Sequence, residues 1–250
     1  MVVDYTKPRT KMYNGNGIKS IIVIVYNQLE YTKKCIEHIF KYTTAFELIV
    51  WHNGLGEEYT KSTTIYLDEL QKRNKNVVVL SSPTNLGFTK PCNECAKIAK
   101  GDYLIFVNND LIVSPEWTEK LAAPFLRDKM VGQTGVCGRG IGDYGQAILS
   151  KRIEYIDGGL FCISKEVYDK FGLFDEQIEF AYCEDQDLSL KLLSNQYKLV
   201  VVPVYVVHKR AVTRHSVHNI DFNAIEVRNR LYVQHKWADY FRTRKWSWQK

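Results

Sequence analysis

The sequence predicts an α/β fold with a mostly parallel, doubly wound sheet. Between residues 19 and 107, apolar strand-like runs alternate with helix-like patterns, and the connections between them are short. This β-α-β-α-β-α-β order favours parallel strands joined by right-handed crossovers. The chain has 250 residues, of which 45% are hydrophobic and 25% charged, so it can bury one substantial core. Ligand-binding side chains are then expected at the carboxyl ends of the strands.

The predicted strands are β-branched or continuously apolar, and the predicted helices have apolar residues at helical spacing. The strands are expected over 19–26, 46–51, 77–80 and 103–107, and the helices over 29–42, about 59–73 and about 88–100. Polar residues directly follow the first two strands: Asn27 follows the first, and His52, Asn53 and Gly54 follow the second. These residues are therefore candidates for the ligand-binding edge.

The stretch from residue 85 to residue 113 carries the strongest functional signal. Asn85 and Gly87 indicate a tight turn, and the apolar strand over 103–107 stops abruptly at Asn108, Asn109 and Asp110. A carboxylate flanked by two amides suits a divalent cation and the ribose and phosphate oxygens that the cation would hold. The alternative is an Asx turn that only caps the strand.

The second half of the chain predicts elements of several kinds. They are a helix over 115–123 with Ser114 as its N-cap, a loop-rich segment over 132–145 with six glycines, a helix over 183–194, and a strand pair over 198–207 divided by Pro203. Glu184, Asp185 and Asp187 crowd the amino end of the second helix, where the helix dipole stabilises carboxylates. Helix capping is the alternative to a catalytic role for these carboxylates. His208 directly follows the second strand of the pair, and it is either a metal ligand or a structural histidine.

Several classes of protein do not fit. No G-x-G-x-x-G motif follows a strand, which argues against a dinucleotide-binding Rossmann fold. No glycine-rich phosphate loop follows the first strand, which argues against a sugar-nucleotide pyrophosphorylase. The first 17 residues lack a signal peptide's apolar core, and the apolar stretch over 199–207 is too short to span a bilayer. The six cysteines lie in apolar contexts, as is typical of reduced thiols, and the C-x-x-C at Cys92 and Cys95 has no second pair with zinc spacing. We therefore expect a cytoplasmic protein, with peripheral contact at the inner face of the membrane as a further option.

The positive charge is concentrated near the carboxyl terminus. Residues 206–250 contain ten Lys or Arg and three Asp or Glu, a local charge of +7 in a chain of net charge +6. From Trp237 to Trp248, aromatic residues are interleaved with cations, which suits either an anionic membrane surface or packing across the catalytic domain. A charge confined to one segment argues against a long nucleic-acid track. The expected organisation is a flexible segment over 1–17, a catalytic domain over 18–221 and a basic, aromatic helical tail over 222–250.

Three ordered motifs resemble one enzyme family. The blocks N-L-G-F, C-N-E and A-K-G-D-Y-L-I-F-V-N-N-D are similar to the central signature of the family 2 glycosyltransferases, which have the A-type, nucleotide-diphospho-sugar transferase fold. The later blocks D-G-G-L-F-C-I-S-K-E-V-Y-D-K-F-G-L-F-D-E and Y-C-E-D-Q-D-L-S-L-K-L are similar to the family's acceptor-side region. The resemblance covers about residues 20–213.

The resemblance implies a donor site for a nucleoside-diphosphate sugar. The residues implied to contact the donor are Val25, Tyr26, Asn27, His52, Asn53, Asn85, Gly87, Asn108, Asn109 and Asp110. Tyr26 would stack on the base, and His52 and Asn53 would meet its hydrogen-bonding edge, where the family usually has two aspartates or Asp-Asn. Asp110 and His208 would hold the divalent cation, Mn²⁺ or Mg²⁺.

The resemblance also implies an acceptor side. Asp185, the second residue of the E-D motif, would be the general base that deprotonates the acceptor hydroxyl, and Gly159 and Glu184 would lie beside it. Arg210 and Arg214 would close over the diphosphate. The expected function is a metal-dependent inverting glycosyltransferase acting on a glycan, lipid-linked or protein acceptor. The alternatives are a nucleotidyltransferase on the same fold and an inactive module that binds a sugar nucleotide or a membrane surface.

Overall fold

The computed structural model describes residues 17–55, 60–208 and 220–244, and these residues form an α/β fold around a seven-stranded sheet of order β11-β6-β10-β4-β1-β2-β3. The strands are β1 Lys19–Val25, β2 Phe46–Asn53, β3 Val77–Ser82, β4 Tyr103–Asn108, β6 Val131–Gly135, β10 Leu160–Ser164 and β11 Lys198–Val201. The first four strands pair in parallel, β11 is parallel to β6, and β10 is antiparallel to both of its neighbours. The mostly parallel, doubly wound sheet predicted from the sequence is confirmed.

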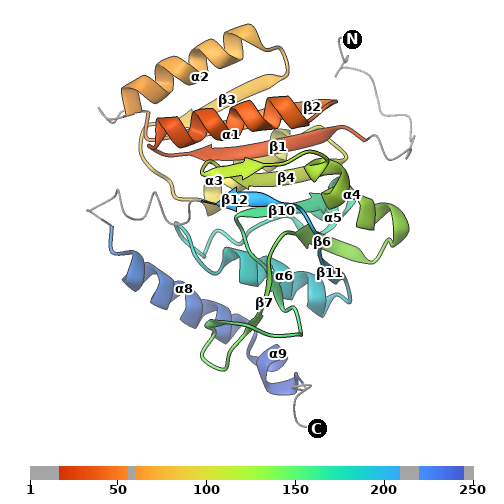
Figure 1. Ribbon diagram of the computed structural model, residues 1–250. Helices are drawn as coiled ribbons and strands as arrows, with labels where there is room; N and C mark the ends of the chain where they lie inside the picture. The colour runs from red at the N-terminus through yellow and green to blue at the C-terminus, as the bar shows by residue number, and fades with distance from the viewer. Residues whose placement is uncertain (1–16, 56–59, 209–219, 245–250) are drawn as a thin grey trace.

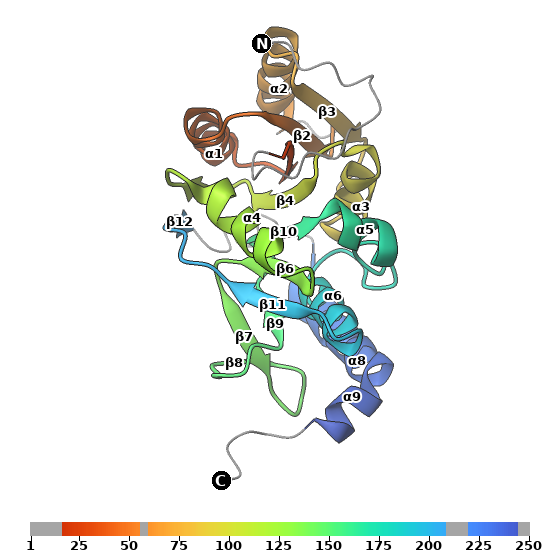
Figure 2. The ribbon, with the colours of Figure 1, turned by 90° about the vertical axis from the view of Figure 1, so that its right-hand side faces the viewer.

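Helices cover both faces of the sheet (Figures 1 and 2). On one face lie α1 Leu29–Tyr42, α2 Lys61–Arg73 and α4 Trp117–Arg127, and on the other lie α3 Thr89–Ile98, α5 Lys165–Phe171 and α6 Glu184–Ser194. Successive side chains of β1 alternate between the two cores, with Ile21 and Val23 on the first face and Ile22 on the second. Burial on both faces is the reason that these strands are continuously apolar in the sequence.

Two short strands connect the sheet to the site. Strand β5, Leu111–Val113, pairs antiparallel with β12, Val206–His208, and the register sets His208 opposite Leu111. The strand pair predicted on either side of Pro203 is therefore split, because β11 joins the main sheet and β12 joins β5. This pairing carries the last residue of β12 back to the end of β4.

Two local predictions differ from the structure. Helix α4 begins at Trp117 because Glu116 has a left-handed φ of 61°, so Ser114 is not its N-cap. The fully buried indole of Trp117 donates a hydrogen bond of 2.9 Å to Thr43 Oγ1, which fixes this start. The glycine-rich segment over 132–145 is not mainly loop, since it contains β6 and β7, Gly138–Ile141, and the latter pairs with β8, Ala147–Ile148, and β9, Tyr155–Ile156.

The described part of the tail forms two helices that pack on the rest of the fold. Helices α8, Phe222–Lys236, and α9, Ala238–Thr243, contribute side chains to a core shared with β7, β9 and α6, below the main sheet in Figure 1. Trp237, Tyr240 and Phe241 pack against this core. Of the two roles expected for the tail aromatics, the structure supports packing across the domain for these three. Trp246 and Trp248 lie outside the described residues, as do residues 1–16 of the expected flexible segment.

None of the described helices is long and apolar enough to cross a membrane. The six cysteines are free, and Cys92 and Cys95 are buried in the helix-covered core, as the sequence predicts for reduced thiols.

Candidate functional site

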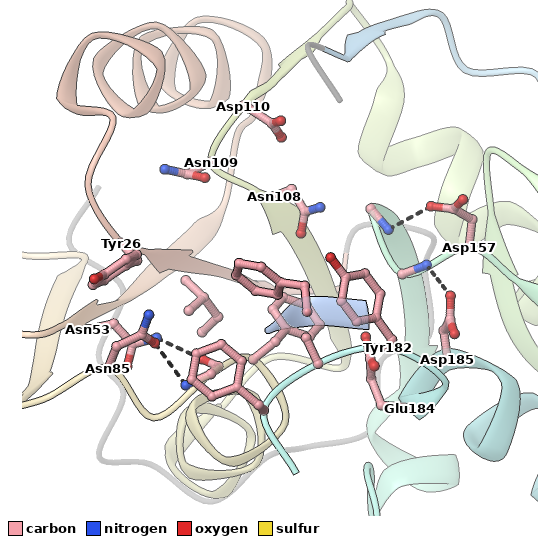
Figure 3. Close-up of a pocket in the computed structure, with 18 of the residues that line it drawn as sticks. Tyr26, Asn53, Asn85, Asn108, Asn109, Asp110, Asp157, Tyr182, Glu184 and Asp185 are labelled. Atoms are coloured by element: carbon pink, nitrogen blue, oxygen red, sulfur yellow. Dashed lines mark hydrogen bonds between the residues drawn. The ribbon is translucent and has the colours of Figure 1, made fainter. Parts of the chain in front are cut away.

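A pocket of about 410 Å³ lies at the carboxyl ends of β1, β2 and β4 (Figure 3). Most of the predicted site residues that the structure describes line it: Tyr26, Asn53, Asn85, Gly87, Asn108, Asn109, Asp110, Gly159, Glu184, Asp185 and His208. Figure 3 shows Tyr26, Asn53 and Asn85 at one end and Asp157, Glu184 and Asp185 at the other, with Asn108 and Asp110 between them. The pocket is therefore an elongated site with two chemically different ends.

Asp110 and His208 lie side by side in the lining of the pocket. Asp110 precedes β5 and His208 ends β12, so the antiparallel pairing of these strands brings Asp110 Oδ1 to 3.2 Å from His208 Nε2. The side chains are 11% and 21% exposed, so both reach the pocket while staying largely packed. A carboxylate beside an imidazole fits a divalent cation such as Mn²⁺ and leaves coordination positions for ligand oxygens. No group of three metal-binding side chains occurs among residues 17–55, 60–208 and 220–244, so such a cation would need ligands from the substrate or elsewhere.

The opposite end of the pocket is acidic. Asp185 lies in the first turn of α6, where its Oδ2 accepts a hydrogen bond of 3.1 Å from Gly158 N and its Oδ1 accepts one of 2.8 Å from Gln186 N. Burial, and then the negative charge of Asp157, raise the pKa of Asp185 above its usual range. Burial, and then the charge of Asp185, raise the pKa of Glu184. These carboxyl groups thus hold protons more readily than exposed ones.

Asp157 was not singled out from the sequence, although it begins the D-G-G-L-F block. It lines the pocket, and its Oδ1 accepts a hydrogen bond of 3.1 Å from Gly159 N. The available signal was an aspartate and two glycines directly before the apolar strand β10. Because β10 runs antiparallel to β4, an aspartate just before β10 lies at the same sheet edge as Asp110, which follows the end of β4.

Asn53 shapes the wall of the pocket. Its Oδ1 accepts hydrogen bonds from Leu86 N and Trp51 Nε1, both at 3.1 Å, and its Nδ2 donates one of 2.7 Å to Gly87 O. Asn53 is 1% exposed, so its amide holds the turn over 85–87 in place. Gly87 has a φ of +78°, and a Cβ there would collide with the backbone of Phe180. Only glycine fits this crossing of two loops.

Three predicted donor residues lie outside this pocket. His52 is 1% exposed and lies on the face of β2 opposite Asn53, because successive side chains of a strand alternate. Burial lowers its pKa, so its imidazole is neutral near pH 7. Val25 is fully buried in the core, and Asn27 Oδ1 accepts a hydrogen bond from Gln28 N in the turn into α1. Their expected contact with the donor is not supported by this geometry, and Arg210 and Arg214 lie outside the described residues.

Aromatic residues that were not predicted as site residues also line the pocket. Phe180 and Tyr182 come from the loop before α6, and Phe222 comes from the first turn of α8. Phe180, Tyr182 and Cys183 have left-handed φ angles of 68°, 71° and 71°. Such backbone strain in non-glycine residues is concentrated at functional sites. The sequence signal was the run F-A-Y-C directly before the E-D motif.

Comparisons with known proteins agree with this architecture. The sequence profile described as Glycosyl transferase family 2 matches residues 20–179. Over 101 residues the chain is 31% identical to the poly(ribitol-phosphate) beta-glucosyltransferase of Bacillus spizizenii, a match that covers 39% of this chain and 15% of that protein. The chain therefore spans well under two thirds of this relative.

Two solved structures share the fold. GalNAc-T7, solved with UDP, GalNAc and Mn²⁺, superposes with a TM-score of 0.76 at 19% identity, over 90% of this chain and 50% of that one. The mannosyltransferase PcManGT of Pyrobaculum calidifontis, solved with GDP-Man and Mn²⁺, superposes with a TM-score of 0.60 at 12% identity, over 94% of this chain and 79% of that one. At these identities the likeness establishes the fold, which is that of the A-type glycosyltransferases. Because the family profile covers well over half of the chain, from the first strand to the segment just before the E-D motif, the chain belongs to glycosyl transferase family 2.

Proposed function

We propose that this chain is a metal-dependent, inverting glycosyltransferase that moves a sugar from a nucleoside-diphosphate sugar to a hydroxyl of a glycan, lipid-linked or protein acceptor. The observation that carries the proposal is the meeting of three distant motifs in one pocket. Asp110, whose Oδ1 lies 3.2 Å from His208 Nε2, is between the Tyr26 end and the Asp185 end. This order matches a nucleotide base, a diphosphate and an acceptor bound in sequence.

Asp185 has the properties of a general base. The acceptor oxygen forms a bond to the anomeric carbon while the bond from that carbon to the diphosphate oxygen breaks, and the acceptor proton passes to the Asp185 carboxylate. A raised pKa makes this carboxylate a stronger proton acceptor than an exposed aspartate, and Asp157 contributes to the raised value. The amides of Gly158 and Gln186 orient both carboxylate oxygens.

The donor end would bind the nucleotide through shape and amide groups. Tyr26 offers an aromatic ring for the base, and Asn85 and Gly87 form the wall that Asn53 holds in position. Asn108 points into the pocket between the two ends (Figure 3). When bound at Asp110 and His208, a divalent cation would neutralise charge on the diphosphate leaving group. The Mn²⁺ present with nucleotide ligands in both similar structures supports this assignment.

A thermal-shift panel tests the proposal. Nucleoside diphosphates of each base, and their sugars, are added with and without Mn²⁺, because a ligand that binds only the folded protein raises its melting temperature. We expect one base to stabilise the chain in a Mn²⁺-dependent manner and its sugar form to release nucleoside diphosphate on incubation. A panel in which no nucleotide changes the melting temperature with or without metal would refute the proposed function.

A further inference from the structure

The acidic end of the pocket is bordered by an aromatic wall formed by Phe180, Tyr182 and Phe222. The ring centroid of Phe222 lies 6.1 Å from that of Phe180 and 6.2 Å from that of Tyr182, with both pairs packed edge to face. All three residues line the pocket and are only half-buried, so they present apolar surface to it. The wall continues from Tyr182 directly into Glu184 and Asp185.

The wall is held in place by a buried amide from the C-terminal helix. Asn229, on α8, is 1% exposed, and its Nδ2 donates hydrogen bonds to Glu179 O at 2.9 Å and Ala181 O at 2.8 Å. These carbonyls flank Phe180 and Tyr182, whose backbones are strained. Helix α8 thus both supplies Phe222 and fixes the loop that supplies the other two rings. A strained loop with a dedicated clamp indicates that the ring positions matter for the site.

The charges at this end favour a ligand that donates hydrogen bonds. This end of the pocket contains the carboxyl groups of Asp157, Glu184 and Asp185, and the described lining residues include no lysine or arginine. Glu184 is 7% exposed, and its Oε2 has no hydrogen-bond partner among the described residues. A carboxylate oxygen accepts a hydrogen bond from a hydroxyl, whereas it repels a phosphate or another carboxylate.

From this combination we infer that the acceptor is a neutral saccharide whose ring packs on the aromatic wall while its hydroxyls face Glu184 and Asp185. The inference rests on the proposed function and narrows its acceptor class. One face of a sugar ring presents C–H groups to the negative face of an aromatic ring, and its hydroxyls supply the donors that the carboxylates need.

The test separates transfer from donor cleavage. With the donor identified by the thermal-shift panel, release of nucleoside diphosphate is measured in water alone, with methyl glycosides of neutral hexoses and N-acetylhexosamines, and with the corresponding sugar phosphates. We expect product with one or more neutral glycosides and little or none with their phosphates. Preferential transfer to the phosphorylated acceptors would overturn the inference.

Substitutions in the wall give the residue-level test. Tyr182→Ala and Phe222→Ala should each raise the KM for the neutral acceptor by roughly 3- to 10-fold, since an aromatic contact of this kind contributes a modest free energy, and should raise the KM for the donor by a smaller factor. Tyr182→Phe should retain the wild-type KM, and Tyr144→Ala, at a site 79% exposed, is the matched control. An unchanged acceptor KM in both alanine variants would overturn the inference.

Asn229→Asp provides a second readout because it keeps the side-chain shape while removing the donors to Glu179 O and Ala181 O. It should raise the acceptor KM by a larger factor than the donor KM. A selective loss of donor binding in this variant would instead assign the clamp to the donor side. Failure of the wild type to bind or cleave any donor would refute the proposed function, and with it this inference.

Discussion

Replacing Arg244 with methionine should destabilise the fold, because it removes the nearer of two cations from a fully buried carboxylate. The Arg244 side chain is 2% exposed and that of Glu154 is 0% exposed, with Arg244 Nη1 lying 3.3 Å from Glu154 Oε1. The same nitrogen donates a hydrogen bond of 2.7 Å to Ile141 O. This contact joins the chain just after α9 to the small sheet of β7, β8 and β9.

The size of the stability loss in Arg244→Met depends on the groups that remain around Glu154. Breaking a buried ion pair by removing one partner costs about 3–5 kcal/mol. Tyr240 Oη and Ile141 N still donate hydrogen bonds to the carboxylate, at 3.1 and 2.9 Å, and Arg152 Nε still lies 3.8 Å from it, so the lower end of that range applies. A loss of about 3 kcal/mol corresponds to a decrease of about 6–12 °C in the melting temperature of a domain of this size.

Calorimetry or circular dichroism at neutral pH measures the change. The double variant Glu154→Gln with Arg244→Met should recover part of the loss, because no uncompensated charge is left buried. Arg242→Met is the control, since that side chain is 76% exposed and pairs only at the surface with Asp239. A melting temperature within about 1 °C of wild type for Arg244→Met would refute the docking of this segment on the domain.

Four further outcomes are expected at the pocket. Asp185→Asn should lower transfer by at least about 10²-fold with little change in donor affinity, and near wild-type turnover would rule out its role as the base. Because Asp185 must be ionised to accept a proton and its pKa is raised, kcat/KM should fall as the pH decreases through that raised pKa. Asp157→Asn removes a repelling charge, so it should move the inflection of the kcat/KM profile to lower pH. An unmoved inflection would contradict the assignment of Asp185 as the general base. Asp110→Ala and His208→Ala should each weaken the Mn²⁺-dependent thermal shift by the nucleoside diphosphate, and full transfer in the presence of chelator would show that no cation is needed. Asn53→Ala should release the turn that it holds and weaken donor binding measured by calorimetry, whereas unchanged affinity would show that this wall does not contact the donor.

The sequence was informative wherever a property depends on neighbours along the chain. Continuous apolar runs predicted β1, β2 and β4 because burial on both faces requires apolar residues at nearly every position. Polar residues that end such runs must lie at one edge of a parallel sheet, so Asn108 and Asp110 could be predicted at the pocket. The E-D motif could likewise be predicted at the start of a helix, and α6 begins at Glu184.

His52 shows where this local reasoning ended. Its position at the end of β2 was predictable, but a shift of one residue along a strand reverses the face on which a side chain lies. The packing of Trp51 and Asn53 toward the pocket side leaves His52 on the opposite face. The sequence gives no marker for this choice, because β2 is buried on both faces and nearly all of its residues are compatible with either core.

Tertiary structure alone decided which distant residues meet. The pairing of β5 with β12 joins Asp110 to His208, and the packing of α8 against the loop before α6 completes the aromatic wall with Phe222. It also decided how the described part of the tail packs, where Lys236 lies 2.8 Å from the buried Asp187 and Trp237 Nε1 donates a hydrogen bond of 2.7 Å to the same carboxylate. Charge and aromatic content are compatible with a lipid surface or a protein one, because both offer anionic groups beside apolar area. The choice between them depends on partner atoms supplied by α6, and those partners are far away in the sequence.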